Sequence, residues 1–293
     1  MTPCASITSG TDVRAVTLAA VSALALDIVV GAAGAAPPRR LAIYYGYPSL
    51  VEGAGGDVAR AVRTFAMYDA IVLGDGLELG HDAADAGLRA EYTRLTQLVP
   101  ALHATARKPV LWGYIDLGRS QQLTLAAIAH RIDAWKQLGV DGIFFDEAGR
   151  DFGVTAAHRV AAVRAAHDRG LAVFMNAFDA NDLFEGWSAG RTDAAGGLGP
   201  RDALLLESFA VREGVRQTAE VNAKRAADAL GWRTRTGVRV FATTTAVGPF
   251  DAAAFEFAWR QAAALGLDGF GWGEPQFSAD TRLPWHERPR ETK

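Results

Sequence analysis

Two adjacent acids, Asp146 and Glu147, end a run of apolar, β-favouring residues at 143–145. Burying an unpaired charge is costly, so a core strand gains nothing from two acids at its end. The exits of buried parallel strands are, however, where α/β enzymes place their catalytic side chains. A helix cap is the structural alternative, but one acid would be enough for a cap. We therefore interpret this position as part of a functional site.

The elements that would carry these acids alternate between strand-like and helix-like segments from Leu41 onward. Eight strands are expected, at 41–47, 70–73, 109–115, 143–145, 172–175, 203–206, 238–242 and 269–272. Helices are expected at 57–68, 85–106, 124–138, 154–169, 181–187, 218–230 and 252–265, with Pro100 kinking or splitting the second. The polar tail from Asp280 predicts a missing or irregular eighth helix. Such alternation predicts an α/β fold, a single (β/α)8 TIM barrel over residues 37–293.

An internal repeat favours the barrel over a doubly wound open sheet, which is the main alternative. The segment 134–137, Ala-Trp-Lys-Gln, followed by Leu-Gly-Val-Asp-Gly, returns at 258–261 as Ala-Trp-Arg-Gln, followed by Leu-Gly-Leu-Asp-Gly at 265–269. The second copy carries three extra residues, close to one helical turn. The copies precede the fourth and eighth strands, which lie half a barrel apart.

In a barrel, the C-terminal ends of all strands converge on one mouth. The side chains expected there are acidic, aromatic or amide-bearing: Tyr45, Tyr47, Asp75, Tyr114, Asp116, Asp146, Glu147, Asn176, Phe178, Glu207, Trp272 and Glu274. Aromatic planes stack on sugar rings, and carboxylates bind hydroxyl or amine groups. The mouth therefore predicts a carbohydrate site, with Asp146 and Glu207 as catalytic candidates and the others as substrate-binding candidates.

Several of these candidates have a structural alternative. Asp75, Asp116 and Glu274 could equally cap helices or accept hydrogen bonds from loop amides. Strand alternation directs Glu147 away from Asp146, so only one of the two acids is expected to face the mouth.

Two carboxylates across a barrel mouth are the usual equipment of glycoside hydrolysis. One stays ionised to attack the sugar or to support the oxocarbenium-like centre, and the other keeps a raised pKa to protonate the leaving oxygen. The sequence lacks the residues that other chemistries need. It has no Gly-x-Ser-x-Gly elbow, no P-loop and no lysine at the C-terminal end of a strand, where a Schiff-base aldolase would need one. With one cysteine and scattered histidines, we expect no metal site and no cofactor.

Composition and the N-terminus limit the partners and the location. Hydrophobic content of 49% suits a large core, and a net charge of −3 offers no basic footprint for nucleic acid. The apolar run 15–26 follows Arg14, and small residues precede Pro37, so residues 1–36 are interpreted as a signal peptide or a disordered extension. Asp27 interrupts the run, which argues against a stable membrane span. We expect a secreted or extracytoplasmic monomer.

Three segments resemble a known group of enzymes. Tyr44-Tyr-Gly-Tyr-Pro-Ser in the first strand, Asp141-Gly-Ile-Phe-Phe-Asp-Glu in the fourth and Glu207-Ser-Phe after the sixth resemble the spherulin-like glycoside hydrolases, which are related to the endo-α-1,4-polygalactosaminidases. The resemblance spans most of residues 41–285, and its specific part is the motif in the fourth strand. It implies a TIM barrel that cleaves α-1,4-linked galactosamine or N-acetylgalactosamine polymers, such as biofilm exopolysaccharides. It also implies functional roles for Asp146, Asn176 and Glu207.

The placement of the two acids also resembles barrels that cleave α-glycosides with retention. By that likeness Asp146 is the nucleophile and Glu207 the acid/base, with carboxyl groups roughly 5–5.5 Å apart. The acidic mouth would also attract a cationic, partly deacetylated amino sugar. Two other functions stay open at this point: a barrel that binds polysaccharide without cutting it, and a cytoplasmic enzyme acting on a small metabolite. The sequence leaves endo and exo action equally open.

Overall fold

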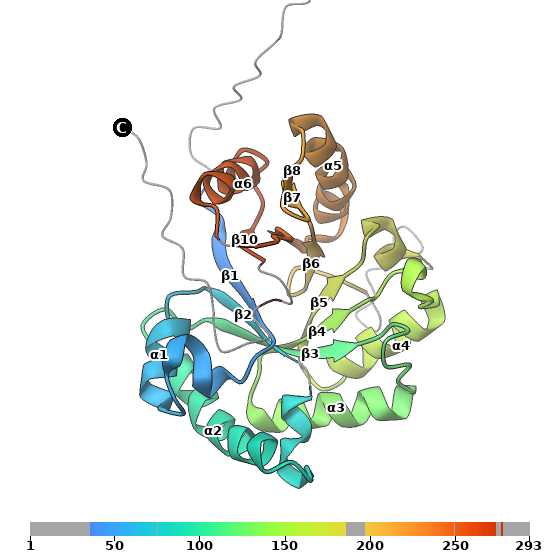
Figure 1. Cartoon of the computed structure of the whole chain (residues 1–293). Coiled ribbons are helices and arrows are strands. Elements are labelled where there is room, and N and C mark those ends of the chain that lie inside the picture. The colour runs from blue at the N-terminus through green and yellow to red at the C-terminus, as the bar shows by residue number, and fades with distance from the viewer. Residues whose placement is uncertain (1–35, 75, 186–196, 249, 274–276, 278–293) are drawn as a thin grey trace, which may run out of the picture. The chain divides into compact units, whose positions relative to one another are not determined.

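The computed structural model describes residues 36–74, 76–185, 197–248, 250–273 and 277. Eight parallel strands form a closed barrel in the order β1-β10-β9-β6-β5-β4-β3-β2 (Figure 1). The barrel strands are β1 (Arg39–Tyr44), β2 (Ala70–Leu73), β3 (Val110–Asp116), β4 (Gly142–Asp146), β5 (Ala172–Asn176), β6 (Ala203–Leu206), β9 (Arg239–Thr243) and β10 (Gly269–Gly271). The predicted α/β barrel is confirmed, and all eight predicted strands are present.

Helices and short 3-10 segments connect the strands. The helices are α1 (Val58–Phe65), α2 (Ala86–His103), α3 (Leu125–Leu138), α4 (Ala156–His167), α5 (Ala219–Thr236) and α6 (Ala252–Ala264). The 3-10 segments are η1 (Pro48–Gly53), η2 (Leu77–Asp82), η3 (Arg150–Phe152) and η4 (Ala180–Phe184). Each of the six helices begins at an Asp or Thr whose side chain accepts a hydrogen bond from a backbone N–H of the first turn.

Three local predictions differ from the structure. A single helix, α2, runs through Pro100, so the predicted split is wrong. Its neighbours Leu98, Val99 and Leu102 are buried in the core, and their burial offsets the hydrogen bond that proline cannot make. The first strand ends at Tyr44 rather than at Tyr47.

The third difference lies after β6. Two short antiparallel strands, β7 (Val211–Arg212) and β8 (Val215–Arg216), form a hairpin that the sequence analysis did not anticipate. Helix α5 then continues past Gly231, where a helix end was expected, to residue 236. The predicted irregularity of the eighth helix falls on residues outside the described part of the chain.

The barrel interior is filled by large side chains beneath the mouth. Strand alternation directs Trp112, Phe144, Phe174 and Phe241 inward, and each of them is almost fully buried. Neighbouring rings pack with centroids 5.0–5.4 Å apart, from Trp112 to Phe174, from Phe144 to Phe174 and from Phe174 to Phe241. This aromatic layer closes the barrel from below and leaves the C-terminal strand ends as the place for a site.

The outer face of the sheet packs against the helices, and β3 shows how closely. Gly113 faces α3, where a Cβ atom would lie 2.2 Å from the ring of Trp135. That indole is fully buried and donates a hydrogen bond to the carbonyl of Tyr114 at 3.0 Å. Glycine therefore lets the tryptophan of α3 reach the backbone of the strand that carries Tyr114. Of the described helices, none is long and apolar enough to cross a membrane.

Candidate active site

Asn176 joins the two predicted catalytic acids. Its Nδ2 donates one hydrogen bond to Asp146 Oδ1 at 2.8 Å and another to Glu207 Oε2 at 2.6 Å. The two carboxylate oxygens therefore lie no further apart than the sum of these distances, 5.4 Å. An amide nitrogen has two hydrogens, so a single side chain satisfies both bonds. Three residues from three neighbouring strands thus form one polar cluster.

Strand periodicity explains why these three side chains meet. Asp146 and Asn176 are the last residues of β4 and β5, and Glu207 follows the last residue of β6. The residues two positions earlier, Phe144, Phe174 and Leu205, all belong to the inner cluster of the barrel. Because alternate residues share a face, the three polar side chains form the next inward layer, at the mouth.

Asp146 is surrounded by hydrogen-bond donors. Besides Asn176, the phenol of Tyr114 donates to its Oδ2 at 3.0 Å, and the backbone N–H of Glu147 donates to its Oδ1 at 2.9 Å. Burial nevertheless raises the pKa of the Asp146 carboxyl above its usual value, since desolvation outweighs the three donors. The donors favour the ionised form and limit that rise.

Glu207 also has a raised pKa. Desolvation is the main cause, and the charge of the nearby Asp146 raises the pKa further. The bond from Asn176 and the positive charge of Arg225 act in the opposite direction. Two coupled carboxyl groups with raised pKa values in a concave mouth are typical of acid–base catalysis.

Both acids sit next to strained backbone. Glu147, which follows Asp146, has a φ of 50°, and Ser208, which follows Glu207, has a φ of 55°. Positive φ values are unfavourable for residues other than glycine and concentrate at functional sites. The chain therefore turns sharply immediately after each acid, which leaves the acid at the rim of the barrel.

Of the aromatic candidates, Tyr114 bonds Asp146 directly and Tyr45 contacts Tyr114. The ring of Tyr45 packs edge-on against that of Tyr114, with centroids 4.9 Å apart. Phe178 is 56% exposed two residues after Asn176, and the guanidinium carbons of Arg212 and Arg225 both lie 5.4 Å from its ring centroid. Tyr45 directly follows β1, and Phe178 lies two residues after the end of β5.

The other two aromatic candidates face elsewhere. Tyr47 is exposed and lies near Gly87, in the first turn of α2. The ring of Trp272 packs against Phe250 and against Phe255 of α6, with centroids 5.4 and 6.1 Å away. Trp272 therefore belongs to the layer between the sheet and the helices rather than to the barrel mouth.

The remaining acidic candidates hold loops. Asp116 is in register with Asp146 and is buried, and its Oδ1 accepts a hydrogen bond from the N–H of Gly118 at 2.5 Å. Glu147 turns away from Asp146 and accepts hydrogen bonds from the hydroxyl and backbone N–H of Ser120. The predicted candidates Asp75 and Glu274 lie outside the described residues.

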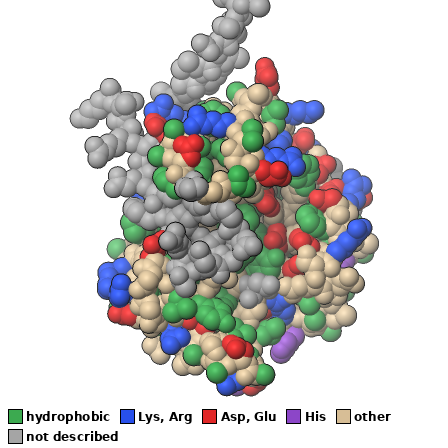
Figure 2. Space-filling view, viewed as in Figure 1, with side chains coloured by type: hydrophobic (Ala, Val, Ile, Leu, Met, Phe, Trp, Pro, Cys, Tyr) green, Lys and Arg blue, Asp and Glu red, His purple; other side chains and the backbone are tan. Residues whose placement is uncertain are grey.

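A cavity of about 440 Å³ lies between the loops that follow β3 and β4. It is lined by Leu117, Gly118, Arg119, Gln122, Leu123, Phe152, Gly153, Val154, Thr155 and His158. The same loops carry Glu147 and its partner Ser120, but the lining includes none of Asp146, Asn176 and Glu207. On the face drawn in Figure 2, acidic and hydrophobic side chains adjoin one another in the described part of the surface.

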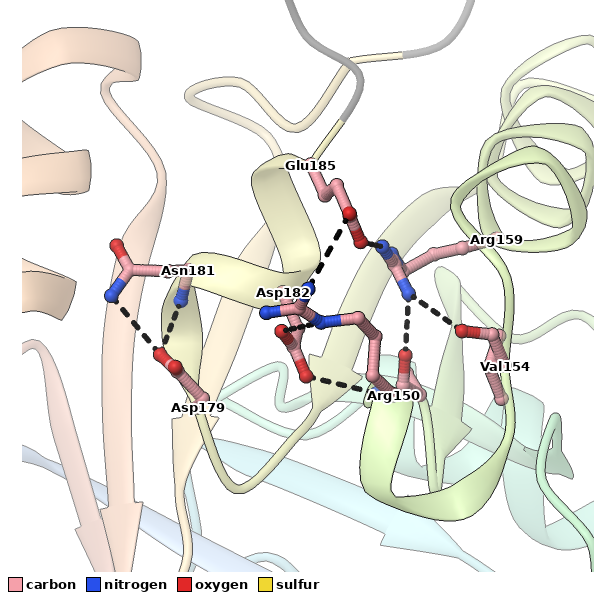
Figure 3. Close-up of polar contacts among 8 residues, drawn as sticks. Arg150, Val154, Arg159, Asp179, Asn181, Asp182 and Glu185 are labelled. Atoms are coloured by element: carbon pink, nitrogen blue, oxygen red, sulfur yellow. Dashed lines mark hydrogen bonds and ion pairs between the residues drawn. The ribbon is translucent and has the colours of Figure 1, made fainter.

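Ion pairs tie together the loops after β4 and β5 (Figure 3). Asp182 of η4 is buried and accepts hydrogen bonds from the backbone N–H and Nε of Arg150, at 2.8 and 2.7 Å. Glu185 lies 3.6 Å from Arg150 and 3.5 Å from the buried Arg159 of α4, which also donates to the carbonyl of Ala148 at 3.0 Å. This network supports the turn that follows Asp146 and Glu147.

Two residues of the site were not anticipated from the sequence. Arg225 of α5 donates hydrogen bonds to the carbonyls of Glu207 and Ser208 at 2.7 and 2.9 Å. Arg212 lies in the unexpected hairpin. An arginine in a charged helix or a loop is usually solvated, so no sequence signal distinguishes either one. Among the described residues no group of His, Cys, Asp and Glu has the arrangement of a metal site.

Sequence comparisons leave the family open, because no protein-family model matches the chain and the search of curated proteins found no match. Solved structures do resemble it. The cellulase Cel5C_n has a TM-score of 0.51 at 10% identity, covering 80% of this chain and 75% of the cellulase. The glycoside hydrolase domain of PelA from Pseudomonas aeruginosa has a TM-score of 0.49 at 13% identity, covering 84% of this chain and 100% of that domain.

A weaker likeness is to an enzyme of another class. A phosphoenolpyruvate phosphomutase from Streptomyces platensis subsp. rosaceus has a TM-score of 0.45 at 15% identity, covering 81% of this chain and 76% of its own. At such low identities these likenesses establish the barrel fold alone. One fold serves many chemistries, so a function has to be inferred from the site.

Proposed function

We propose that this protein is a glycoside hydrolase that works by a retaining, two-carboxylate mechanism. Asp146 is the nucleophile and Glu207 the acid/base. The observation that carries the proposal is the single nitrogen of Asn176 bonded to both carboxylates, which limits the nearest-oxygen distance to 5.4 Å. Retaining enzymes hold their carboxyl groups about 5–5.5 Å apart, whereas inverting enzymes need roughly 6.5–9.5 Å to admit a water molecule.

In the first step, an oxygen of ionised Asp146 attacks the anomeric carbon, and protonated Glu207 gives its proton to the leaving glycosidic oxygen. The product is a glycosyl ester on Asp146 and a free sugar hydroxyl. In the second step, Glu207 takes a proton from water, the water oxygen bonds to the anomeric carbon, and the ester bond to Asp146 breaks. Both carboxyl groups then return to their starting protonation states.

The electrostatics of the site suit both roles of Glu207. The charge of Asp146 raises the pKa of Glu207, so the acid is protonated when it is needed as a proton donor. Formation of the ester removes the charge of Asp146 and with it that contribution, so the pKa of Glu207 falls when it must act as a base. Tyr114 and the N–H of Glu147 favour the ionised form of Asp146, which is the form that attacks.

For the substrate we propose a polysaccharide of α-1,4-linked galactosamine or N-acetylgalactosamine, on the strength of the motif resemblance. Tyr45, which packs against Tyr114, and the exposed Phe178, two residues after Asn176, are the rings proposed to stack on sugar units. The buried Oδ1 of Asn176 has no hydrogen-bond partner among the described residues, which leaves it for a sugar hydroxyl. Residues 1–36 as an export signal, and a secreted monomer, remain part of this proposal.

Digestion of an α-1,4-galactosamine polymer, followed by reducing-end release and product sizes, tests this function. Wild type should release oligomers, whereas Asp146→Asn and Glu207→Gln should each lose about 10²-fold or more of the rate. Asp151→Asn, an exposed acid five residues from Asp146, is the matched control and should behave as wild type. Retention of the polymer without cleavage by wild type would instead identify a polysaccharide-binding barrel. If wild type neither cleaves nor binds the polymer, the proposed substrate is refuted.

A further inference from the structure

The backbone that carries Glu207 is strained at two positions. Ser208 has a φ of 55° and Ala210 a φ of 62°, although neither residue is a glycine. Such a turn persists only where surrounding contacts determine its shape. Contacts with β9 and the loop after it supply part of that support, since Phe209 donates to the carbonyl of Thr243 at 2.9 Å and the hydroxyls of Ser208 and Thr245 lie 2.8 Å apart.

Helix α5 supplies the rest, chiefly through Arg225. Its Nη2 donates to the carbonyl of Glu207 at 2.7 Å and its Nη1 to the carbonyl of Ser208 at 2.9 Å. Both bonds come from one rigid, planar guanidinium group, so they fix the directions of two consecutive backbone carbonyls. Phe178 covers the same guanidinium, and the buried Asn222 of α5 accepts from the N–H of Ala210 at 3.1 Å.

We propose that Arg225 is the positioning residue for Glu207, fixing the acid through its backbone and stabilising its ionised form by charge. The proposal concerns the acid/base of the proposed glycosidase and therefore rests on that function for its effect on turnover. Its effect on the titration of Glu207 does not depend on any substrate. Both of these Arg225 hydrogen bonds go to backbone carbonyls, so neither of them reaches the carboxylate of Glu207 or of Asp146.

The charges around Glu207 fix the sign of the expected effect. In the described part of the chain, Asp146 of β4 raises the pKa of Glu207 and Arg225 of α5 lowers it. Arg212 of β7 faces Arg225 across Phe178, and Tyr114 of β3 is bonded to Asp146. Removing the positive charge of Arg225 therefore removes an effect that lowers the pKa of Glu207, while Asp146 still raises that pKa. Glu207 should then hold its proton to a higher pH.

The test is a carbon-13 NMR titration of the Glu207 carboxyl in the full chain, assigned by its loss in Glu207→Gln. Arg225→Met removes both the planar guanidinium group and the charge, Arg225→Lys keeps the charge alone, and Lys224→Met removes an exposed charge from the same helix as the control. We expect Glu207 to titrate at a higher pH in Arg225→Met, to titrate closer to the wild-type pH in Arg225→Lys, which keeps the charge, and to titrate as in wild type in Lys224→Met. Circular dichroism establishes that each variant is folded.

Turnover of the galactosamine polymer separates positioning from charge. Arg225→Lys should lose roughly 10- to 100-fold in kcat with little change in KM, because the acid is displaced while its charge environment is kept. Wild-type kcat in Arg225→Lys, or a wild-type titration of Glu207 in folded Arg225→Met, would overturn the proposal. If Arg225→Met does not fold, the kcat of Arg225→Lys alone tests the proposal: a reduced kcat supports it and a wild-type kcat overturns it. An inactive wild type whose Glu207 still shifts in Arg225→Met would refute the glycosidase function and leave the positioning role supported.

Discussion

At the scale of single residues, the two acids of the site destabilise the folded state when both are ionised. Asp146 and Glu207 are both desolvated, and each raises the energy of the other when both are ionised. Asn176 holds them together, and Tyr114 favours the charge on Asp146. The sequence placed all four residues among the candidates at the barrel mouth, because each lies at or near the end of an apolar strand. It could not reveal the Asn176 bridge, which depends on the register of three strands.

Tyr114→Phe tests the contribution of one hydrogen bond to the nucleophile. Loss of the phenol removes a donor that favours ionised Asp146, so the pKa of Asp146 should rise and the acidic limb of the pH–rate profile should move to higher pH. A bond to a charged group is worth about 1.5–3 kcal/mol, which predicts a loss of roughly 10- to 100-fold in kcat/KM. Tyr92→Phe, on the surface helix α2, is the control. An unmoved acidic limb would show that Tyr114 has no influence on Asp146.

At the scale of elements, strands were predicted better than loops. The apolar runs of β2 to β6 are short, continuous and bounded by polar residues, as buried parallel strands are. The hairpin β7–β8 has four strand residues and no apolar periodicity, and its position is set by contacts with Thr245 of a distant loop. The ion pairs of η4 likewise join segments 32 residues apart, which no local pattern can predict.

Asp182→Ala tests the tie between the loops after β4 and β5. The substitution leaves the backbone N–H of Arg150 without its acceptor and removes the ion pair between the buried Asp182 and the exposed Arg150 side chain. We expect the free energy of unfolding to fall by about 1–3 kcal/mol, with kcat largely kept because Asp182 does not contact the acids. Urea unfolding followed by tryptophan fluorescence measures the change, with the exposed Asp168→Ala as control. Equal stability of the two variants would contradict a structural role for the tie.

At the scale of the whole molecule, the closed barrel determines which residues can meet. Asp146 and Glu207 are 61 positions apart in sequence. Both accept a hydrogen bond from Nδ2 of Asn176 because β4, β5 and β6 are neighbouring strands in register. The alternation of strands and helices was enough to predict this architecture. Substrate identity is different, since it depends on the loops at the mouth rather than on this alternation.

The raised pKa values predict how the stability of the whole molecule depends on pH. Both acids have folded-state pKa values above the ordinary values of 3.8 and 4.5, so the native state binds more protons than the unfolded state. Their stabilising contribution is therefore full below about pH 4 and is lost as pH rises through the raised values. Asp146→Asn/Glu207→Gln should gain stability over wild type as pH rises from about 4 to 7.

Urea unfolding of both proteins across that pH range measures the difference. The double variant Asp151→Asn/Glu213→Gln, which changes two exposed acids, controls for the general effect of removing negative charge. A stability difference that stays constant with pH would mean that the two buried acids do not titrate abnormally.

The stereochemistry of the first product tests the central claim most directly, because the proposed retaining mechanism makes two displacements at the anomeric carbon. Proton NMR during the first minutes of polymer digestion distinguishes the α-anomer from the β-anomer before mutarotation mixes them. We predict that the α-anomer of the released reducing end appears first, and that neither Asp146→Asn nor Glu207→Gln forms it at a comparable rate. Initial release of the β-anomer would contradict the retaining pair, and so would α-anomer formation that survives either substitution.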